Sequence, residues 1–565
     1  MLGDQARAAL SLVLAASALF AAGAAHAEEP WSDPDPAAPA IRIPIGDFGV
    51  TGAAEYRAAG TYINPIAVNT ISQRRIGWLE HRLRLDGSID YDEKVRIVTS
   101  IDVLDGVLWG DNGSPLEPPV TEAGTTVNAR NPNQGVPCIG YKGGAEGDPL
   151  SSEGYGYSLC ESKLFNVRRL YGDVVTPIGL IRIGRQPFNM GNTLQGVPGD
   201  GRFNRFGIGR QGNYVDRILF GTKPLEALKP AEERSLSLDE GFFVAALYDH
   251  LVSDNLQLFT DDEHQVGGAV FYKSKELSII KDLELLTYYV HRFSDEYSTN
   301  VNIFGGRAIG RFGPVYVGLE AAANVGSTKE VAAAYKAITN DPIVDQRILQ
   351  VGARAVVRYD YPVVRAGEPR EPGLSAYLEV NYASGDGDPQ ARTDLSQFTW
   401  AQDMNVGLLM FEHILHFQSA RAAAAATETL ARLGAKSFPV DSIDTRGSFT
   451  NGFALFPQMD FRPHPDILFR TGVLVAWAPD PVVDPVTSLL ARDGESIDDD
   501  LVNFAGGKPG QFYGTEVDLR AQWRFLEHFI ADLEGAIFVP GDAFEDENGD
   551  AVRSVLVQGR TTFFF

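Results

Sequence analysis

Charged side chains occupy every second position in several long stretches of this sequence. Between residues 76 and 91, Glu80, Arg82, Arg84 and Asp86 alternate with mostly apolar residues. Fixed charges of both signs on one face of a segment can line a water-filled conduit and sort the ions that cross it. They can equally form ion pairs with one another, so the pattern alone leaves both kinds of chemistry open.

The same alternation elsewhere predicts a larger set of charged residues on one water-facing surface, and we expect this set to line a pore. Its members are Glu80, Arg82, Arg84, Asp86, Arg96, Asp102, Arg182, Arg354, Arg358, Glu379, Arg470, Glu516, Asp518, Arg520, Arg524, Asp532 and Glu534. Acidic and basic members nearly balance, whereas a polyanion needs fixed positive charge along its path.

Two histidines, His413 and His416, lie three positions apart in a segment that reads as a helix, residues 405–433. Side chains at this spacing share a helix face and are close enough to bind one divalent metal. No third ligand is assignable, and a packed histidine pair is the alternative. The order Glu412, His413, His416 also differs from the HExxH motif of zinc proteases, so no metal or other cofactor is predicted.

Acidic residues form two clusters near the C-terminal end of the sequence, in segments that are expected to be loops. They either stay solvated or bind Ca²⁺ and bridge to lipopolysaccharide. The clusters are Asp493, Glu495 and Asp498–Asp500, and Asp542, Glu545, Asp546, Glu547 and Asp550. Their spacing does not fit the Ca²⁺-binding loop of an EF-hand.

The two cysteines, Cys138 and Cys160, lie in one glycine-rich segment. Residues 1–27 read as an export signal, and an exported protein folds under oxidising conditions, so a disulfide that closes this loop is predicted.

No arrangement typical of an enzyme accompanies these residues. An outer-membrane hydrolase would need a Ser–His or Asp–His pair at the loop mouth or the lipid face, and His81 lies among leucines without an assignable nucleophile. Because the sequence also lacks a nucleophile elbow, a phosphate-binding loop and a zinc motif, an enzyme is not predicted.

The elements that position the charged residues are β-strands. A strand face with several charges cannot pack into a soluble core, but it can face water while the apolar face meets lipid. The alternating segments exceed the five or six residues that are roughly usual in soluble sheets. Tyrosine and tryptophan lie near the ends of their apolar faces, as at Tyr91, Tyr359 and Trp523, which is typical of an interfacial aromatic girdle.

The predicted fold class is therefore all-β, a transmembrane antiparallel up-and-down β-barrel of about eighteen strands. The strands are expected at 48–62, 76–90, 94–106, 163–175, 178–188, 213–223, 241–253, 264–274, 282–296, 299–311, 314–325, 346–361, 374–385, 448–462, 466–478, 511–525, 528–540 and 552–565.

Long and short connections alternate along this strand order. The long ones are 107–162, 189–212, 326–345, 386–447 and 479–510. In outer-membrane barrels the long loops are extracellular and the short turns periplasmic, so both termini are expected in the periplasm. The helix expected in the long external 386–447 loop either folds into the lumen and narrows it or lies over the rim as a lid.

The N-terminus reads as an export signal. Residues 1–27 combine Arg7, an alanine- and leucine-rich stretch and the small-x-small end Ala25–Ala27, which is typical of a secretory signal peptide. No later run of about 18 apolar residues suggests a membrane helix.

The rest of the chain is predicted to contain a periplasmic N-terminal segment, 28–47, and one barrel, 48–565. The last strand ends in Phe563–Phe565, similar to the signal that the outer-membrane barrel-assembly machinery reads. The net charge of −25 argues against nucleic acid as a partner.

Three short motifs resemble the alginate-export family of eighteen-stranded outer-membrane barrels. They are Trp109-Gly110-Asp111, Gly184-Arg185-Gln186 and Ala383-Ser384-Gly385-Asp386-Gly387-Asp388-Pro389. The resemblance implies a Gram-negative outer-membrane barrel that exports acidic polysaccharide through an arginine-lined conduit or admits small solutes passively. The mixed charge of this chain departs from a purely basic conduit.

The function expected from the sequence is that of an outer-membrane porin for hydrophilic or charged solutes, embedded in lipid and lipopolysaccharide. Export of a secreted polysaccharide and a surface receptor or adhesin with a plugged lumen are the alternatives. The solute, the pore radius and the oligomeric state are left open.

Overall fold

A computed structural model gives the fold of this protein. The described residues are 41–70, 75–92, 94–110, 120–122, 125–127, 163–188, 193–198, 204–209, 214–230, 233–235, 240–253, 263–295, 297–362, 371–435, 443–492, 497–525 and 528–565. The predicted signal peptide, 1–27, and the predicted disulfide between Cys138 and Cys160 lie outside these residues.

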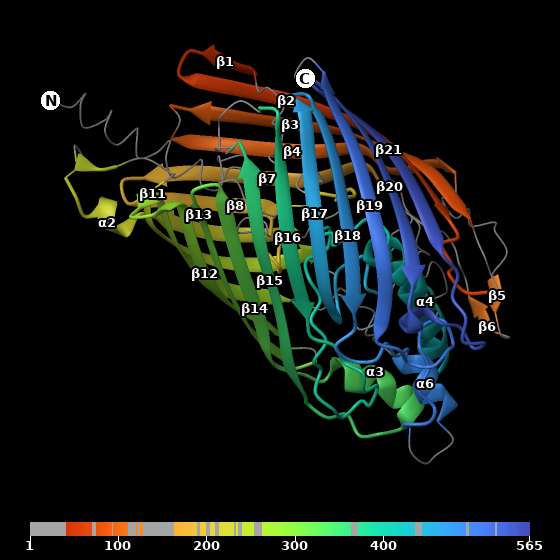
Figure 1. The fold of residues 1–565 in the computed structure, drawn as a ribbon. Helices are drawn as coiled ribbons and strands as arrows, with labels where there is room; N and C mark the ends of the chain where they lie inside the picture. Colours follow the sequence, from red (N-terminus) through yellow and green to blue (C-terminus); the bar gives the residue numbers. More distant parts are fainter. Residues whose placement is uncertain are drawn as a thin grey trace.

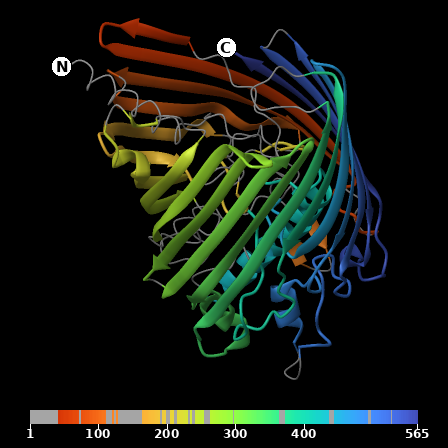
Figure 2. The same cartoon turned by 60° about the vertical axis from the view of Figure 1, so that its left-hand side comes forward.

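The main sheet has nineteen strands, and eighteen of them, all except β1, close into an antiparallel barrel (Figure 1). Closure is made by β2 and β21, which pair from Glu55 with Phe564 to Asn64 with Val555. Figure 2 shows the wall curving around from β2–β4 to β19–β21. The predicted fold class and strand number are therefore confirmed.

The barrel strands follow the chain order without crossovers. They are β2 (Phe48–Asn64), β3 (Ile76–Tyr91), β4 (Val95–Gly110), β7 (Lys163–Thr176), β8 (Gly179–Pro187), β9 (Tyr214–Thr222), β10 (Gly241–Ser253), β11 (His264–Leu277), β12 (Ile280–Ser294), β13 (Thr299–Phe312), β14 (Val315–Thr328), β15 (Gln346–Tyr361), β16 (Gly373–Ala383), β17 (Gly452–His464), β18 (Ile467–Trp477), β19 (Phe512–Phe525), β20 (Phe529–Pro540) and β21 (Ser554–Phe564).

Three short strands were not predicted. β1 (Ile41–Ile45) pairs with Phe48–Gly52 of β2, so the predicted periplasmic segment 28–47 contributes a strand. β5 (Val120–Glu122) and β6 (Thr125–Val127) form a separate hairpin within the predicted 107–162 loop.

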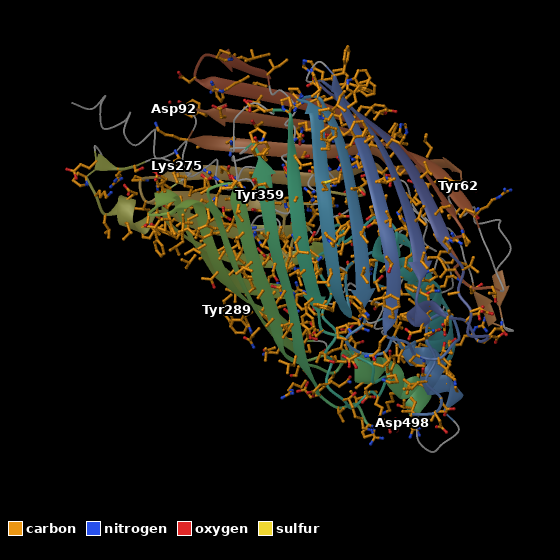
Figure 3. All side chains as sticks on the ribbon, viewed as in Figure 1. Tyr62, Asp92, Lys275, Tyr289, Tyr359 and Asp498 are labelled. Carbon is orange, nitrogen blue, oxygen red and sulfur yellow. The ribbon has the colours of Figure 1, made fainter. Side chains whose placement is uncertain are left out.

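The period-two pattern separates the two faces of the wall. On β19, Glu516 and Asp518 are 0% exposed, whereas Leu519 and Trp523 are 57% and 48% exposed. In Figure 3, Tyr289 and Tyr359 lie on the outside of the barrel. A charged side chain on a lipid-facing position would cost about 2–4 kcal/mol at the bilayer midplane, so an apolar exterior fixes which face of each strand points inward.

Three helices gather at one end of the barrel, opposite the end that holds the C-terminus (Figure 1). Here α3 (Glu330–Thr339), α4 (His416–Arg432) and α6 (Pro485–Ala491) pack through small and apolar side chains. We call this the helical cap. Other short helices are α2 (Pro224–Ala227), the π-helix η2 (Met410–Leu415) and the 3₁₀-helix η3 (Asp542–Phe544). Among the described residues, no helix is both long and apolar enough to cross a membrane.

Candidate transport pathway

The predicted pore-lining residues lie on the inner face of the wall. All of them are buried except Asp86, Arg96 and Arg524, which are partly exposed. A buried charge is tolerated only when it is paired or hydrogen-bonded, so the partners of these residues decide what they do.

Ion pairs between neighbouring strands hold one group of these residues. Asp102 on β4 accepts from Arg84 Nε at 2.7 Å and from Arg168 Nη1 at 3.1 Å. On the next strands, Asp173 accepts from Arg182 Nε at 2.6 Å and from Arg96. Each carboxylate therefore bridges two arginines, which forms a polar ladder around the inner wall.

Sequence reasoning missed several members of this ladder. Arg168 and Asp173 lie on β7, where the register with β4 shifts between Ser100 and Ile101. A bulge of this kind moves later residues to the opposite face, so the alternation of β7 looks mixed. Arg217 and Asp249 pair at 2.6 Å between β9 and β10.

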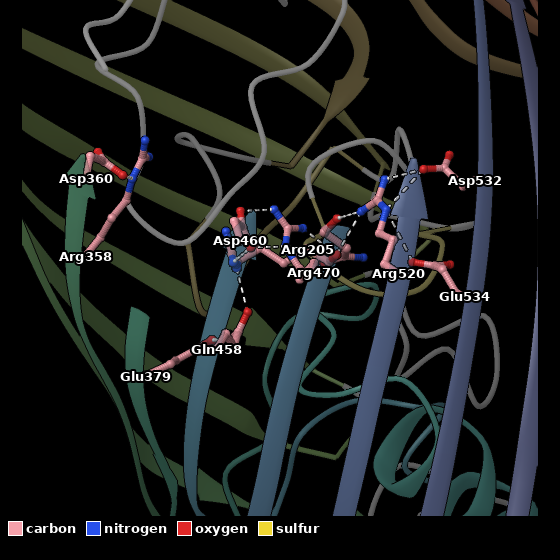
Figure 4. Close-up of polar contacts among 11 residues, drawn as sticks. Arg205, Arg358, Asp360, Glu379, Gln458, Asp460, Arg470, Arg520, Asp532 and Glu534 are labelled. Atoms are coloured by element: carbon pink, nitrogen blue, oxygen red, sulfur yellow. Dashed lines mark hydrogen bonds and ion pairs between the residues drawn. The ribbon is translucent and has the colours of Figure 1, made fainter. Parts of the chain in front are cut away.

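The connection between β8 and β9 enters the lumen and is held there by a second group of inner-wall residues. Arg205 Nη2 donates to Asp460 Oδ1 at 2.9 Å, and the carbonyl oxygen of Arg205 accepts from Arg470 at 2.7 Å and from Arg520 at 2.8 Å. Figure 4 shows Arg205 between Asp460 and Arg520. The arginines predicted to line a pore here bind an inserted loop instead of open water.

The same inserted loop continues along the wall toward β20 and β21. The amide of Gly207 donates to Glu534 Oε1 at 3.2 Å, and Arg560 Nη1 donates to the Gly207 carbonyl at 3.1 Å. Gly207 has φ +77°, and its ideal Cβ position would lie 2.5 Å from Asn405 Nδ2, so any other residue would strain the backbone here and displace the Asn405 side chain.

The connection between β16 and β17 also enters the lumen. One carboxylate, Glu516 on β19, accepts the backbone amides of Leu408 and Leu409 through Oε1 at 2.7 and 2.9 Å and that of Met410 through Oε2 at 2.5 Å. These amides lie at the start of η2, where backbone N–H groups have no partner within the helix. Glu516 therefore fixes this segment inside the barrel.

Apolar side chains fill the space between the inserted segments and the wall. The cluster joins Phe411 and Phe449 of the β16–β17 connection to Phe456, Tyr513 and Phe538 of the wall. Between the two inserted loops a gap of about 20 Å³ remains, which is room for about one water molecule. The lumen is filled along this side of the barrel.

The two alternatives for the 386–447 loop are thus realised in different parts of it. Residues 404–415 lie in the lumen, whereas α4 packs in the helical cap. His413 contacts the Trp78 ring with centroids 6.0 Å apart, and His416 Nε2 lies 3.4 Å from Asp444 Oδ1. Within the described part of the chain no group of three residues is arranged to hold a metal.

A larger cavity, of about 320 Å³, remains beside the inserted segments at the helical cap. Its walls come from the inner faces of β13 and β15, from α3 and from the connections after β16 and β18. None of the predicted pore-lining residues lines it.

The sequence matches no protein-family model and no curated protein. Among solved structures, OccAB1 of Acinetobacter baumannii is 10% identical over 91% of this chain and 96% of its own, with a TM-score of 0.43. The outer membrane protein opdK of Pseudomonas aeruginosa is 10% identical over 91% and 98%, with a TM-score of 0.41.

A third solved structure, Pseudomonas aeruginosa OccK2 (OpdF) in complex with glucuronate, is 9% identical over 91% of this chain and 96% of its own, with a TM-score of 0.41. Because these identities and TM-scores are low, no residue role in those proteins is transferred to this chain.

Proposed function

We propose that this protein is an outer-membrane channel that admits small hydrophilic or charged solutes passively. The observation that carries the proposal is the closed barrel with apolar side chains outside and a charged ladder inside. A closed barrel satisfies every wall hydrogen bond in lipid, and a charged interior favours water and polar solutes.

The proposed setting is the outer membrane of a Gram-negative cell, with lipid and lipopolysaccharide around the wall and the helical cap outside. Asp499 is exposed and directly follows Asp498, which Figure 3 shows at the cap end, and Asp92 is exposed at the opposite end. A cysteine placed at each position and labelled on intact cells with an impermeant maleimide tests the orientation. We expect labelling at Asp499→Cys alone, and the reverse pattern would contradict the topology.

Channel function is tested with purified protein in planar bilayers under KCl. We expect discrete conductance steps, which are small because inserted loops fill part of the lumen. Replacement of Arg82, Arg84, Arg354 and Arg358 by serine tests the proposed pore-lining role. The reversal potential should shift if these residues face the permeating ions, and an unchanged value would remove them from the pathway.

The second candidate function is a surface receptor or adhesin with a plugged lumen. The observation that favours it is the pair of inserted loops, which bond to each other through Asn204 Nδ2 and the Asp403 carbonyl at 2.7 Å. A receptor of this kind gives no current steps, so the same bilayer recording separates the two candidates.

Export of an acidic polysaccharide, which the resemblance to the alginate-export family implies, has less support. The inner arginines are paired with carboxylates or bind loop carbonyls, so little positive charge is available to a polyanion. Transport of a labelled uronic acid polymer into proteoliposomes would restore this alternative.

A further inference from the structure

The cavity beneath the helical cap combines an apolar floor with polar and charged side chains. Its floor includes Val301 and Ile303 of β13, Ile348 of β15 and Leu395 of the β16–β17 connection. The three strand residues belong to an apolar cluster that continues across the inner wall to Phe271. This strip lies on the inner face of the barrel wall, and it offers a surface for a hydrocarbon group.

Two of the polar side chains that line the cavity are deeply buried. Asp444 and Ser448 are 2% and 1% exposed, and both line the cavity. Within the described residues, Asp444 Oδ2 and Ser448 Oγ have no hydrogen-bond partner. The other carboxylate oxygen, Asp444 Oδ1, accepts the Arg446 amide at 2.9 Å and lies 3.4 Å from His416 Nε2. An unpaired buried acceptor is costly, and a donor in the cavity would satisfy it.

The outer mouth of the cavity is acidic. Asp386 and Asp388 line both the cavity and an open hollow of about 650 Å³, which Asp480 also lines. Burial, together with the neighbouring carboxylates of Asp388 and Asp480, raises the pKa of Asp386 to about 6. Positive charge that approaches this mouth is attracted, and negative charge is repelled.

The charge of the lining points in the same direction. The cavity is lined by five carboxylates, those of Glu263, Glu330, Asp386, Asp388 and Asp444, and by two guanidinium groups, those of Arg292 and Arg446. Five negative and two positive charges leave an excess of three negative charges. Arg292 is in addition engaged by Glu263 at 3.7 Å.

We propose that this cavity binds a small organic cation, with an ammonium group donating to Asp444 and Ser448 and a hydrocarbon or aromatic body on the Val301, Ile303 and Ile348 floor. The proposal rests on the proposed channel function, since the bound cation is then a solute on its way through the barrel. A volume of about 320 Å³ is at the lower end of the range for ligand sites and holds one ring with a short amine.

Direct binding tests this site without transport. Isothermal titration of the detergent-purified full chain uses benzylammonium as the probe, with benzyl alcohol, benzoate and ethylammonium as matched comparisons. We expect benzylammonium to bind most tightly, because benzyl alcohol lacks the charge, benzoate reverses it and ethylammonium lacks the ring. Asp444→Asn should weaken benzylammonium binding by roughly tenfold or more, because a charged acceptor is lost, and Ser448→Ala should weaken it less.

The control variant is Asp499→Asn, which removes an exposed carboxylate at the same end of the barrel and should leave binding unchanged. Equal or tighter binding of benzoate would overturn the proposal, as would unaltered affinity in a folded Asp444→Asn protein. If that variant fails to fold, the comparison of the four probes on the unmodified chain still tests whether the cavity prefers an organic cation. If the protein conducts K⁺ but does not bind the probe, the proposed binding site is wrong and the channel function stands. If it binds the probe but gives no conductance, the proposed channel function is wrong.

Discussion

Single carboxylates decide how the lumen is filled. Glu516 joins the inner wall to three consecutive amides of the β16–β17 connection, and hydrogen bonds to a charged group contribute about 1.5–3 kcal/mol each. The sequence alternation predicted that Glu516 lies on the inner face. Its role in holding a loop could not be predicted, because its partner Met410 lies 106 positions earlier in the chain.

Replacement of Glu516 by glutamine should loosen the inserted segment. The amide keeps one acceptor oxygen but loses the charge and the second oxygen, so we expect openings in single-channel recordings to become roughly tenfold more frequent. The matched control is Glu284→Gln on β12, which is paired with Arg307 and Lys273 on the wall. Recordings that are identical for Glu516→Gln and the unmodified protein would contradict this role.

Titration of Asp444 should change the stability of the contact between α4 and residues 443–451. Burial raises the pKa of Asp444 from 3.8 to about 6, so the folded loop favours the neutral form more than the unfolded chain does, and the carboxylate is charged above about pH 6. The stabilisation is complete below the ordinary pKa and is lost as the pH rises through about 6. The groups that face Asp444 are His416 on α4 and Arg446 on its own segment.

Hydrogen exchange measures this effect at the Thr445 amide, which donates to Ser419 Oγ of α4 at 3.1 Å. We expect its protection to fall between about pH 4 and pH 7 after correction for intrinsic exchange. Asp444→Asn should abolish the change, whereas His416→Gln should preserve it. A pH profile that follows His416 instead would assign the titration to the imidazole.

At the scale of elements, the strands were predictable because the alternation of polar and apolar residues within each strand shows which face meets water. The observed bounds of β10 and β15 are those expected from the alternation. β17 begins at Gly452, later than the predicted residue 448, because Asn451 adopts a left-handed conformation with φ 41° that interrupts the extended chain.

The inserted loops could not be predicted in the same way. Arg205 reaches Asp460, which is 255 positions later in the chain, and no local periodicity encodes a contact of that kind. An arginine on an inner strand face has the same sequence pattern whether it meets water, a carboxylate or a loop carbonyl. The face of each candidate site residue was therefore predictable, and its partner was not.

Replacement of residues 204–209 by a glycine–serine linker of equal length should widen the lumen. The substitution removes the Asn204 and Arg205 side chains, which anchor the loop to the Asp403 carbonyl and to Asp460. The loop carbonyls would then move away from Arg470, Arg520 and Arg560, and these side chains would face water. We expect a severalfold increase in single-channel conductance, measured in planar bilayers. The control places the same kind of linker at α2, Pro224–Ala227, which lies outside the lumen in Figure 1 and should leave conductance unchanged.

At the scale of the whole molecule, charge is distributed unevenly between the wall and the cap. The inner wall pairs its charges, as in Arg84 with Asp102 and Arg182 with Asp173, so it contributes little net field. The cap end carries clustered acids, Asp498–Asp500 and Asp542–Glu547, within a chain of net charge −25. The field that an approaching ion meets first is therefore negative.

We therefore expect the channel to prefer cations. Under a KCl gradient across a planar bilayer, the reversal potential should have the sign for K⁺ selectivity, and the preference should weaken as salt rises from about 0.1 M to about 1 M, where the screening length falls to roughly 3 Å. Neutralising Asp386, Asp388 and Asp480 to asparagine should reduce it further, since these residues lie at the mouth of the cavity. A reversal potential of the anion-selective sign at low salt would contradict this account, because it would require the paired arginines of the inner wall, rather than the acids of the cap, to set the field along the path.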